Sequence, residues 1–264
     1  MQTSSFQSAI KELTDDQTPR VWSLLVTVFG ELAQDKGARI SGLLLRHISE
    51  RIGVKPEAMR VAIHRLRKDG WIDSQRTGRT SAYFLTEWGL AQSALASPRI
   101  YASEPAANQA WLVLTNPAQQ QQIGDATGAW MSANLLVTAQ EPAQSDAFVT
   151  PLDADKQLPD WMTSKVCDAQ TVQMSYTFST ALIALQSRLD RTPNLTSLEI
   201  AALRVLLVHS WRRIVLKVPV LPDYVFPKDW CGSICRDNVS VLLSQYPKQD
   251  LGKLEDSIAS ESGD

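Results

Sequence analysis

Residues 56–69 read PEAMRVAIHRLRKD, and this stretch decides the fold of the first third of the chain. Pro56 suits the first turn of a helix, and Gly70 suits the position just after its end. At 100° per residue, one side of this helix carries four apolar side chains, those of Met59, Ala62, Ile63 and Leu66. The opposite side carries Glu57, Val61, His64 and Lys68, flanked by Arg60, Arg65 and Arg67. The spacing predicts a helix that packs by one side and presents cations on the other.

So many cations on one short helix repel each other by a few tenths of a kcal/mol per pair, and phosphate binding would remove that cost. A single helix fits the major groove of DNA, and its N-terminal half enters deepest. We therefore expect Arg60, Val61 and His64 to contact bases. We expect phosphate contacts from three residues: Lys55, Arg65 and Lys68. Each arginine alone could equally be solvated, and His64 could be a packed or capping histidine, so the prediction depends on the joint pattern.

The neighbouring segments complete a recognisable module. A wide apolar stripe predicts a helix from Pro19 to about residue 32, and Ser41 can cap a helix over 42–51 that ends at Gly53. After the arginine-rich helix, two β-prone runs at 71–76 and 80–85 surround a glycine turn and predict a hairpin. Helix, turn, helix and hairpin form a winged helix-turn-helix over residues 19–98.

The tip of this hairpin carries two arginines, Arg76 and Arg79, which we expect to reach phosphates or the minor groove. After the hairpin, Thr86 can cap a closing helix that runs to about Ala96, and Pro98 is expected to end the module.

The remaining chain divides by pattern into four parts. Residues 1–18 are expected to be a flexible N-terminus. Residues 99–175 are expected to be a linker and a central α+β domain, with strands near 111–115, 135–138 and 148–149. Helical spacing predicts a C-terminal helical domain over 176–248, with helices starting near residues 176, 196 and 233. Residues 249–264 are polar and are expected to be a disordered tail.

Charge and composition agree with this organisation. The net charge is −2 over 264 residues, but residues 39–79 hold ten basic and four acidic side chains, a local charge of +6 on a body of −8. Such an asymmetry concentrates phosphate attraction on one surface. No apolar run is long enough to cross a membrane, and no secretory signal precedes the three cysteines. A cytoplasmic protein without disulfides is therefore expected.

Signatures of catalysis and metal binding are missing from the sequence. There is no G-x-S-x-G, G-x-x-x-x-G-K-[ST], G-x-G-x-x-G or H-E-x-x-H motif. Cys231 and Cys235 lack a second pair at zinc-finger spacing. We expect no enzyme activity, no cofactor and no metal.

Two parts of the chain resemble a known family. Residues 19–30, 60–71 and 78–89 resemble the N-terminal region of PaaX-type regulators, the phenylacetic acid degradation repressor family. The C-terminal segments 204–213, 219–222 and 227–232 are similar to the same family. The resemblance implies an α+β chain with three parts: an N-terminal winged helix-turn-helix, a central small ferredoxin-like (Cas2-like) domain and a C-terminal helical domain.

The resemblance also implies a homodimer that represses an aromatic-acid catabolic operon and leaves double-stranded DNA when phenylacetyl-CoA binds. A symmetric dimer predicts an operator with inverted repeats about one DNA turn, ~34 Å, or a multiple of it apart.

The segment around Trp211 has two possible interpretations. In one, an effector pocket is built from four residues: His209, Trp211, Arg212 and Arg213. Trp211 would be its aromatic wall, and an arginine would pair with a CoA phosphate. In the other, Trp211 is a core residue and the arginines bond to acidic neighbours or carbonyls.

Three other functions remain as alternatives: a winged-helix regulator of another pathway with a different acyl-CoA effector, a winged helix used for protein contacts, and an enzyme acting on an acyl-CoA.

Overall fold

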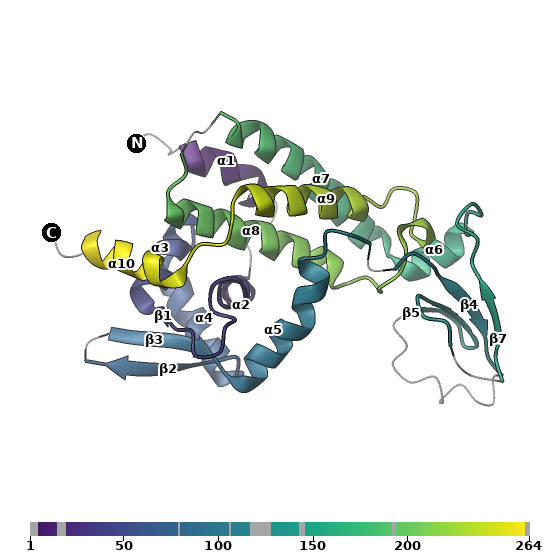
Figure 1. Ribbon diagram of the computed structural model, residues 1–264, viewed down its shortest axis with the longest axis horizontal. Coiled ribbons are helices and arrows are strands. Elements are labelled where there is room, and N and C mark those ends of the chain that lie inside the picture. Colours follow the sequence, from purple (N-terminus) through teal and green to yellow (C-terminus); the bar gives the residue numbers. More distant parts are fainter. Residues whose placement is uncertain are drawn as a thin grey trace. The chain divides into compact units, whose positions relative to one another are not determined.

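The computed structural model describes residues 5–14, 20–78, 80–105, 107–116, 128–142, 146–191 and 194–261. The fold mixes α-helices with two small antiparallel sheets, as expected for an α+β chain (Figure 1). The chain forms two compact units, each made of separate segments. Unit 1 comprises residues 1–100, 180–212 and 239–264, and unit 2 comprises residues 101–179 and 213–238.

Unit 1 contains the predicted helices and hairpin. The helices are α2 (Val21–Leu32), α3 (Gly42–Arg51) and α4 (Pro56–Lys68), followed by α5 (Glu87–Ile100). Strand β1 (Ile40–Ser41) joins β2 (Ile72–Thr77) and β3 (Thr80–Leu85) in an antiparallel sheet of order β1-β3-β2. Register in the hairpin runs from Ile72 opposite Leu85 to Thr77 opposite Thr80. The expected hairpin is therefore confirmed.

Local chemistry explains where these elements begin and end. Ser41 caps α3, because its hydroxyl accepts a hydrogen bond from the Leu44 amide at 3.0 Å. Thr86 does the same for α5 through the Gly89 amide at 3.0 Å. Gly53 and Gly70, which follow α3 and α4, have φ of 86° and 74°, a conformation that side chains with a Cβ rarely adopt. The predicted caps and stops are confirmed.

One predicted boundary is wrong. Pro98 does not end α5, since the helix continues to Ile100 with Pro98 inside its last turns. Gly89 occupies a close approach at the start of the same helix, where an added Cβ would collide with the carbonyl oxygen of Trp71. The expected helix start at Pro19 lies outside the described residues.

Both ends of the chain were expected to be unstructured, but the described residues near each end, 5–14 and 251–261, are helical. Helix α1 (Ser5–Thr14) buries Phe6, Ala9 and Ile10, and helix α10 (Leu251–Glu261) buries Leu254 and Ile258. The predictions failed because each segment is mostly polar and its few apolar residues fall on one narrow helical face. Those few residues are enough to dock each helix.

The two terminal helices both bond to α3. Glu255 of α10 accepts a hydrogen bond from the Ser41 amide at 2.7 Å, and α10 contacts α3 and β1. Gln7 of α1 donates to the Arg51 carbonyl at 2.6 Å. The carbonyls in the last turn of a helix have no partner within the helix, so Gln7 satisfies one of them.

Unit 2 is built on a four-stranded antiparallel sheet. Its strands are β4 (Trp111–Leu114), β5 (Gly128–Ser132), β6 (Leu135–Thr138) and β7 (Phe148–Pro151), in the order β5-β6-β4-β7. Three of these strands were expected, and β5 was not. Ala129, Met131 and Val137 join the core of this unit with residues of the short helix α6 (Asp160–Val166) and of segment 218–226.

Three longer helices contribute residues to both units. They are α7 (Ala169–Leu189), α8 (Ser197–Val215) and α9 (Gly232–Gln245), and the short 3-10 helix η2 (Asp223–Val225) lies between the last two. The predicted starts of α8 and α9 are confirmed within one residue, whereas α7 begins earlier than the predicted residue 176. Thr196 and Glu199 bond reciprocally at the start of α8, at 2.9 and 3.3 Å. Among the described residues, no helix combines the length and apolar character that crossing a bilayer requires.

Docking of α10 leads to a stability prediction. Leu254 is fully buried, so Leu254→Ala should lower the free energy of unfolding by about 2–5 kcal/mol, from lost burial and the cavity left behind. Asp256→Ala on the exposed side of α10 is the matched control and should change stability by no more than about 0.5 kcal/mol. Chemical denaturation of the full chain measures both, and equal small effects would mean that α10 does not dock.

Candidate nucleic-acid interface

Helix α4 has the two faces that its spacing predicts. Met59, Ala62, Ile63 and Leu66 are buried. The residues expected to face outward are all exposed: Glu57, Arg60, Val61, His64, Arg65, Arg67 and Lys68. Val61 is the clearest case, because an apolar side chain 71% exposed gains nothing from burial within the described chain.

The cations of this face have different surroundings. Arg60 faces Glu57 at 4.0 Å across one helical turn. Lys55 and Lys68 are exposed, and within the described ranges neither has a carboxylate within ion-pair distance. Exposed cations with no close carboxylate suit contact with a polyanion.

Arg65 is held more firmly than its neighbours. Its guanidinium lies 4.9 Å from the centre of the Trp22 ring on α2 and 3.4 Å from Asp69. A cation over an aromatic face is typically worth about 0.5–1 kcal/mol at an exposed site. Arg65 therefore fixes α4 to α2 in addition to exposing its charge.

The hairpin tip is only partly described. Arg76 is exposed, and its Nε donates to the Gly78 carbonyl at 3.1 Å, which holds the side chain along the turn. Gly78 has φ of 62°, as the turn requires. Arg79 lies outside the described residues.

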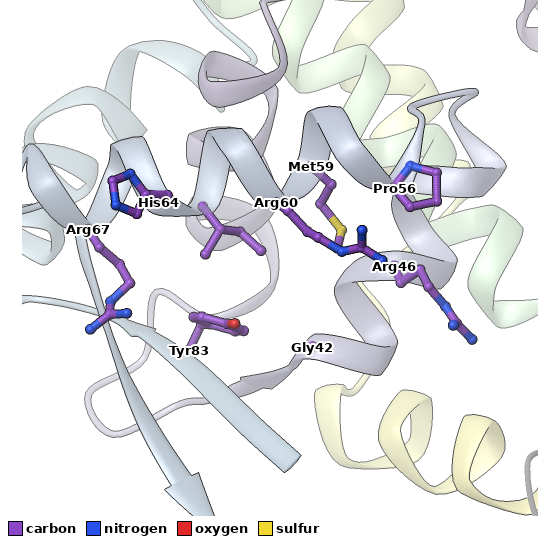
Figure 2. Close-up of a pocket in the computed structure, with 9 residues that line it drawn as sticks. Gly42, Arg46, Pro56, Met59, Arg60, His64, Arg67 and Tyr83 are labelled. Atoms are coloured by element: carbon purple, nitrogen blue, oxygen red, sulfur yellow. The ribbon is translucent and has the colours of Figure 1, made fainter. Parts of the chain in front are cut away.

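A groove of about 410 Å³ opens beside α4 (Figure 2). Its lining comes from α3, α4 and β3: Gly42, Arg46, Pro56, Met59, Arg60, Ile63, His64, Arg67 and Tyr83. Figure 2 shows Tyr83 below α4, on the side of Gly42. We call this the α3–α4 groove. Three guanidinium groups line it and no carboxylate does, so its field favours an anion.

The sequence reasoning missed three of these residues as candidates for binding. Arg46 was placed on a supporting helix, Arg67 on a flank of α4, and Tyr83 in a hairpin strand. The helical phase of Arg67 relative to Met59 and Ile63 was a usable signal, because these three residues lie within about 80° of each other. Nothing in the local sequence placed Arg46 or Tyr83 beside them.

The residues proposed for an effector pocket are buried or half-buried in the structure. His209 and Trp211 are buried, and His209 Nδ1 lies 3.1 Å from the Thr27 hydroxyl of α2. Arg212 donates to the same hydroxyl at 3.1 Å. Arg213 is half-buried and belongs to unit 2. These contacts favour the interpretation in which this segment has a structural role over the one in which it forms an effector pocket.

Arg204, in the same helix, makes a buried ion pair with α2. Its Nε lies 2.5 Å from Glu31 Oε1 of α2, and both side chains are almost fully buried. Its second nitrogen donates to the carbonyls of Leu243 and Tyr246 at 2.8 and 2.6 Å, at the end of α9. The guanidinium of Arg204 therefore links its own helix, α8, to α2 and α9.

The cysteines and acidic groups form no cluster for a metal ion in the described part of the chain. No group of three or more His, Cys, Asp or Glu side chains is placed to hold a metal ion there. All three cysteines are free thiols. Burial raises the pKa of Cys235 to about 12, and its Sγ lies 3.3 Å from the Ser175 carbonyl, so this thiol stays protonated near neutral pH.

Comparison with known proteins relates both ends of the chain to one family. The family model for a PaaX-like protein matches residues 20–89, and the model for the PaaX-like protein C-terminal domain matches residues 168–248. The transcriptional repressor PaaX of Escherichia coli (strain K12) is 27% identical over 241 residues, which cover 81% of this chain and 76% of that protein. The solved structure of the uncharacterized protein Rv0674 from Mycobacterium tuberculosis is 15% identical and covers 89% of this chain and 96% of that chain, with a TM-score of 0.46.

The contacts of Arg204 give a second stability prediction. Arg204→Met should cost about 3–5 kcal/mol of unfolding free energy, because the carboxylate of Glu31 loses its buried cation. Arg191→Ala, at an exposed arginine, should cost less than about 0.5 kcal/mol. The double variant Glu31→Gln with Arg204→Met should recover part of the loss. If Arg204→Met melts at the temperature of the wild type, the pair does not anchor α2.

Proposed function

The chain belongs to the PaaX family, and from this premise we propose that it is a DNA-binding transcriptional repressor whose residues 20–98 form a winged helix-turn-helix. The observation that carries the proposal is α4, with its four buried apolar residues and an outer face of exposed cations. The order of α3, α4 and the β2–β3 hairpin supports it, because that is the order of a helix-turn-helix followed by a wing. Family membership supports a regulator and not an enzyme.

In this proposal α4 is the recognition helix. Arg60, Val61 and His64, in its N-terminal and central turns, contact base edges in the major groove. An arginine can bond a guanine with two parallel hydrogen bonds, and Val61 offers an exposed apolar surface to a thymine methyl. Lys55, Arg65 and Lys68 contact phosphates, and Arg76 and Arg79 on the wing reach phosphates or the minor groove.

The proposed regulation follows the family. We infer a homodimer that represses a phenylacetate catabolic operon in the cytoplasm, binds an inverted-repeat operator, and leaves it when phenylacetyl-CoA binds. An effector releases DNA only by its differential affinity for two states of the protein. The buried contacts of His209 and Arg212 with Thr27 support a role for this segment in positioning α2, so we place the acyl-CoA contacts outside it.

For unit 2 we propose a ferredoxin-like arrangement. Numbered along the chain from β4, the four strands stand in the sheet in the order 4-1-3-2, and every neighbouring pair is antiparallel. This is the strand order of a ferredoxin-like sheet. The residues between β6 and β7 that the structure describes contain no helix, so this unit would be a reduced form of that arrangement.

The experiment that tests this proposal is selection of bound DNA from a random pool, with and without phenylacetyl-CoA. We expect a symmetric site without the ligand and loss of recovery with it, whereas acetyl-CoA should have no effect. Recovery of no preferred sequence would contradict specific DNA binding. An unchanged yield with phenylacetyl-CoA would contradict only the effector.

Arg60 provides a sharper test of the recognition helix. Arg60→Ala should weaken binding to the selected site by about 1–3 kcal/mol while leaving the melting temperature unchanged, since the side chain is exposed and its only described ion pair is long. Arg191→Ala is the control for loss of an exposed arginine elsewhere. Unchanged affinity of Arg60→Ala in an electrophoretic shift assay would refute the role given to Arg60.

Salt dependence separates DNA binding from a winged helix used for protein contacts. Phosphate contacts release counterions, so the affinity for DNA should fall steeply between about 50 and 200 mM salt. A flat dependence would favour the protein-contact alternative.

A further inference from the structure

The arginines of the α3–α4 groove are weakly held by their own protein. Arg46 lies 3.7 Å from Glu50, Arg60 lies 4.0 Å from Glu57, and Arg67 lies 3.9 Å from Asp73. These pairs are at or near the limit for ion pairs, and their side chains are about half exposed or more. Exposed pairs of this kind contribute little to stability. An external anion can therefore replace the carboxylates at little cost.

Tyr83 supplies a polar group of another kind to the same groove. It is paired with Ser74 on β2 and Ile40 on β1, so two neighbouring strands fix its backbone. An added Cβ on Gly42 would lie 3.5 Å from Tyr83 Cε2, which places the edge of the ring against the start of α3. In the part of the chain that the structure describes, no hydrogen bond to its hydroxyl is found. The phenol therefore has a fixed body and an available donor.

The base of the groove is apolar. Met59 and Ile63 line it from the buried side of α4, and Pro56 lines it at the start of that helix. The nearby carboxylate of Glu255 is outside the lining and already accepts the Ser41 amide. The groove thus combines an apolar base, three guanidinium groups and one phenol.

We propose that the α3–α4 groove seats a phosphodiester of the DNA backbone, bound by Arg46, Arg67 and Tyr83. This inference rests on the proposed DNA binding and adds three contacts to it. The two arginines donate to the phosphate oxygens, the Tyr83 hydroxyl donates a further hydrogen bond, and Met59 and Ile63 face the deoxyribose carbons. The sugar–phosphate backbone of a DNA strand offers both a charged and an apolar part to such a groove.

The position of Arg67 favours the backbone over a base. At 100° per residue, Arg67 lies on the flank of α4, about 80° from Met59 on its buried side and about 100° from Lys68 on its outer face. When the outer face of a recognition helix enters the major groove, its flanks meet the strands that border the groove. Contacts there set the register of the protein on DNA and carry no sequence information.

The inference predicts a specific pattern of losses. Arg46→Ala and Arg67→Ala should each weaken the selected duplex and a scrambled duplex of equal length by the same factor. Each should also reduce the slope of log affinity against log salt by about 0.9, the value for one lost phosphate contact. Tyr83→Phe should lower both affinities about tenfold and leave the salt slope unchanged, because a hydrogen bond to a charged group is lost without loss of charge.

Fluorescence anisotropy titrations at several salt concentrations measure both quantities on the full chain. Arg191→Ala and Tyr176→Phe are the matched controls, since both residues lie outside the groove lining and should leave affinity and slope unchanged. Circular dichroism checks folding, and Arg46→Gln replaces Arg46→Ala if the latter unfolds.

Two results would overturn the inference while leaving DNA binding intact. One is wild-type affinity in all three groove variants. The other is a loss confined to the selected duplex, which would make these residues base readers. Failure of the wild-type protein to bind either duplex would instead overturn the proposed function.

Discussion

The contact between Arg204 and Glu31 is the constraint on which unit 1 depends. Burying two charges costs free energy unless each is well bonded. Here Arg204 pairs with Glu31 through Nε, and its Nη1 donates to two carbonyls at the end of α9. An arrangement that needs α2, α8 and α9 at once tolerates little displacement of any of them. Thr27, one turn before Glu31 on α2, adds contacts with His209 and Arg212 of α8. Helix α2 is therefore bonded along its length to a helix far away in sequence.

Helix α3 is constrained in the same way by the chain termini. Glu255 bonds the residue that caps its start, Gln7 bonds a carbonyl in its last turn, and Arg51 pairs with Glu199 of α8 at 3.4 Å. Helix α4, in contrast, is fixed mainly by its four buried apolar residues and by Arg65 against Trp22. The supporting helices thus carry the polar bonds to the rest of unit 1, and α4 keeps most of its cations exposed.

Sequence reasoning succeeded where periodicity alone decides the structure. The two faces of α4, the hairpin and the caps at Ser41 and Thr86 depend on residues within a few positions of each other, and all were predicted correctly. It failed where a partner is distant in sequence. The helicity of residues 251–261 depends on a surface formed by β1 and α3. Likewise, nothing near His209 in the sequence indicates its contact with Thr27, 182 residues away. Strand β5 was missed because Gly128 and Ser132 weaken its β-strand pattern, while its pairing with β6 stabilises it.

Two groups of arginines in unit 1 differ in how tightly they are paired, and the difference suggests how affinity for DNA and stability of the fold could be separated. Arg204 and Arg188 make contacts of 2.5 Å with carboxylates of other helices, so replacing either arginine should lower the free energy of unfolding. Arg46, Arg60 and Arg67 face carboxylates at 3.7–4.0 Å on exposed surfaces, so their loss should leave the fold intact. A repressor must hold DNA tightly and still release it, and a loosely paired cation meets both needs. In the proposed function, its carboxylate neighbour would compete with phosphate at low cost, and the arginine would recover that neighbour when the DNA leaves. A cation buried in an ion pair of the fold, such as Arg204, could not exchange partners in this way without unfolding part of unit 1.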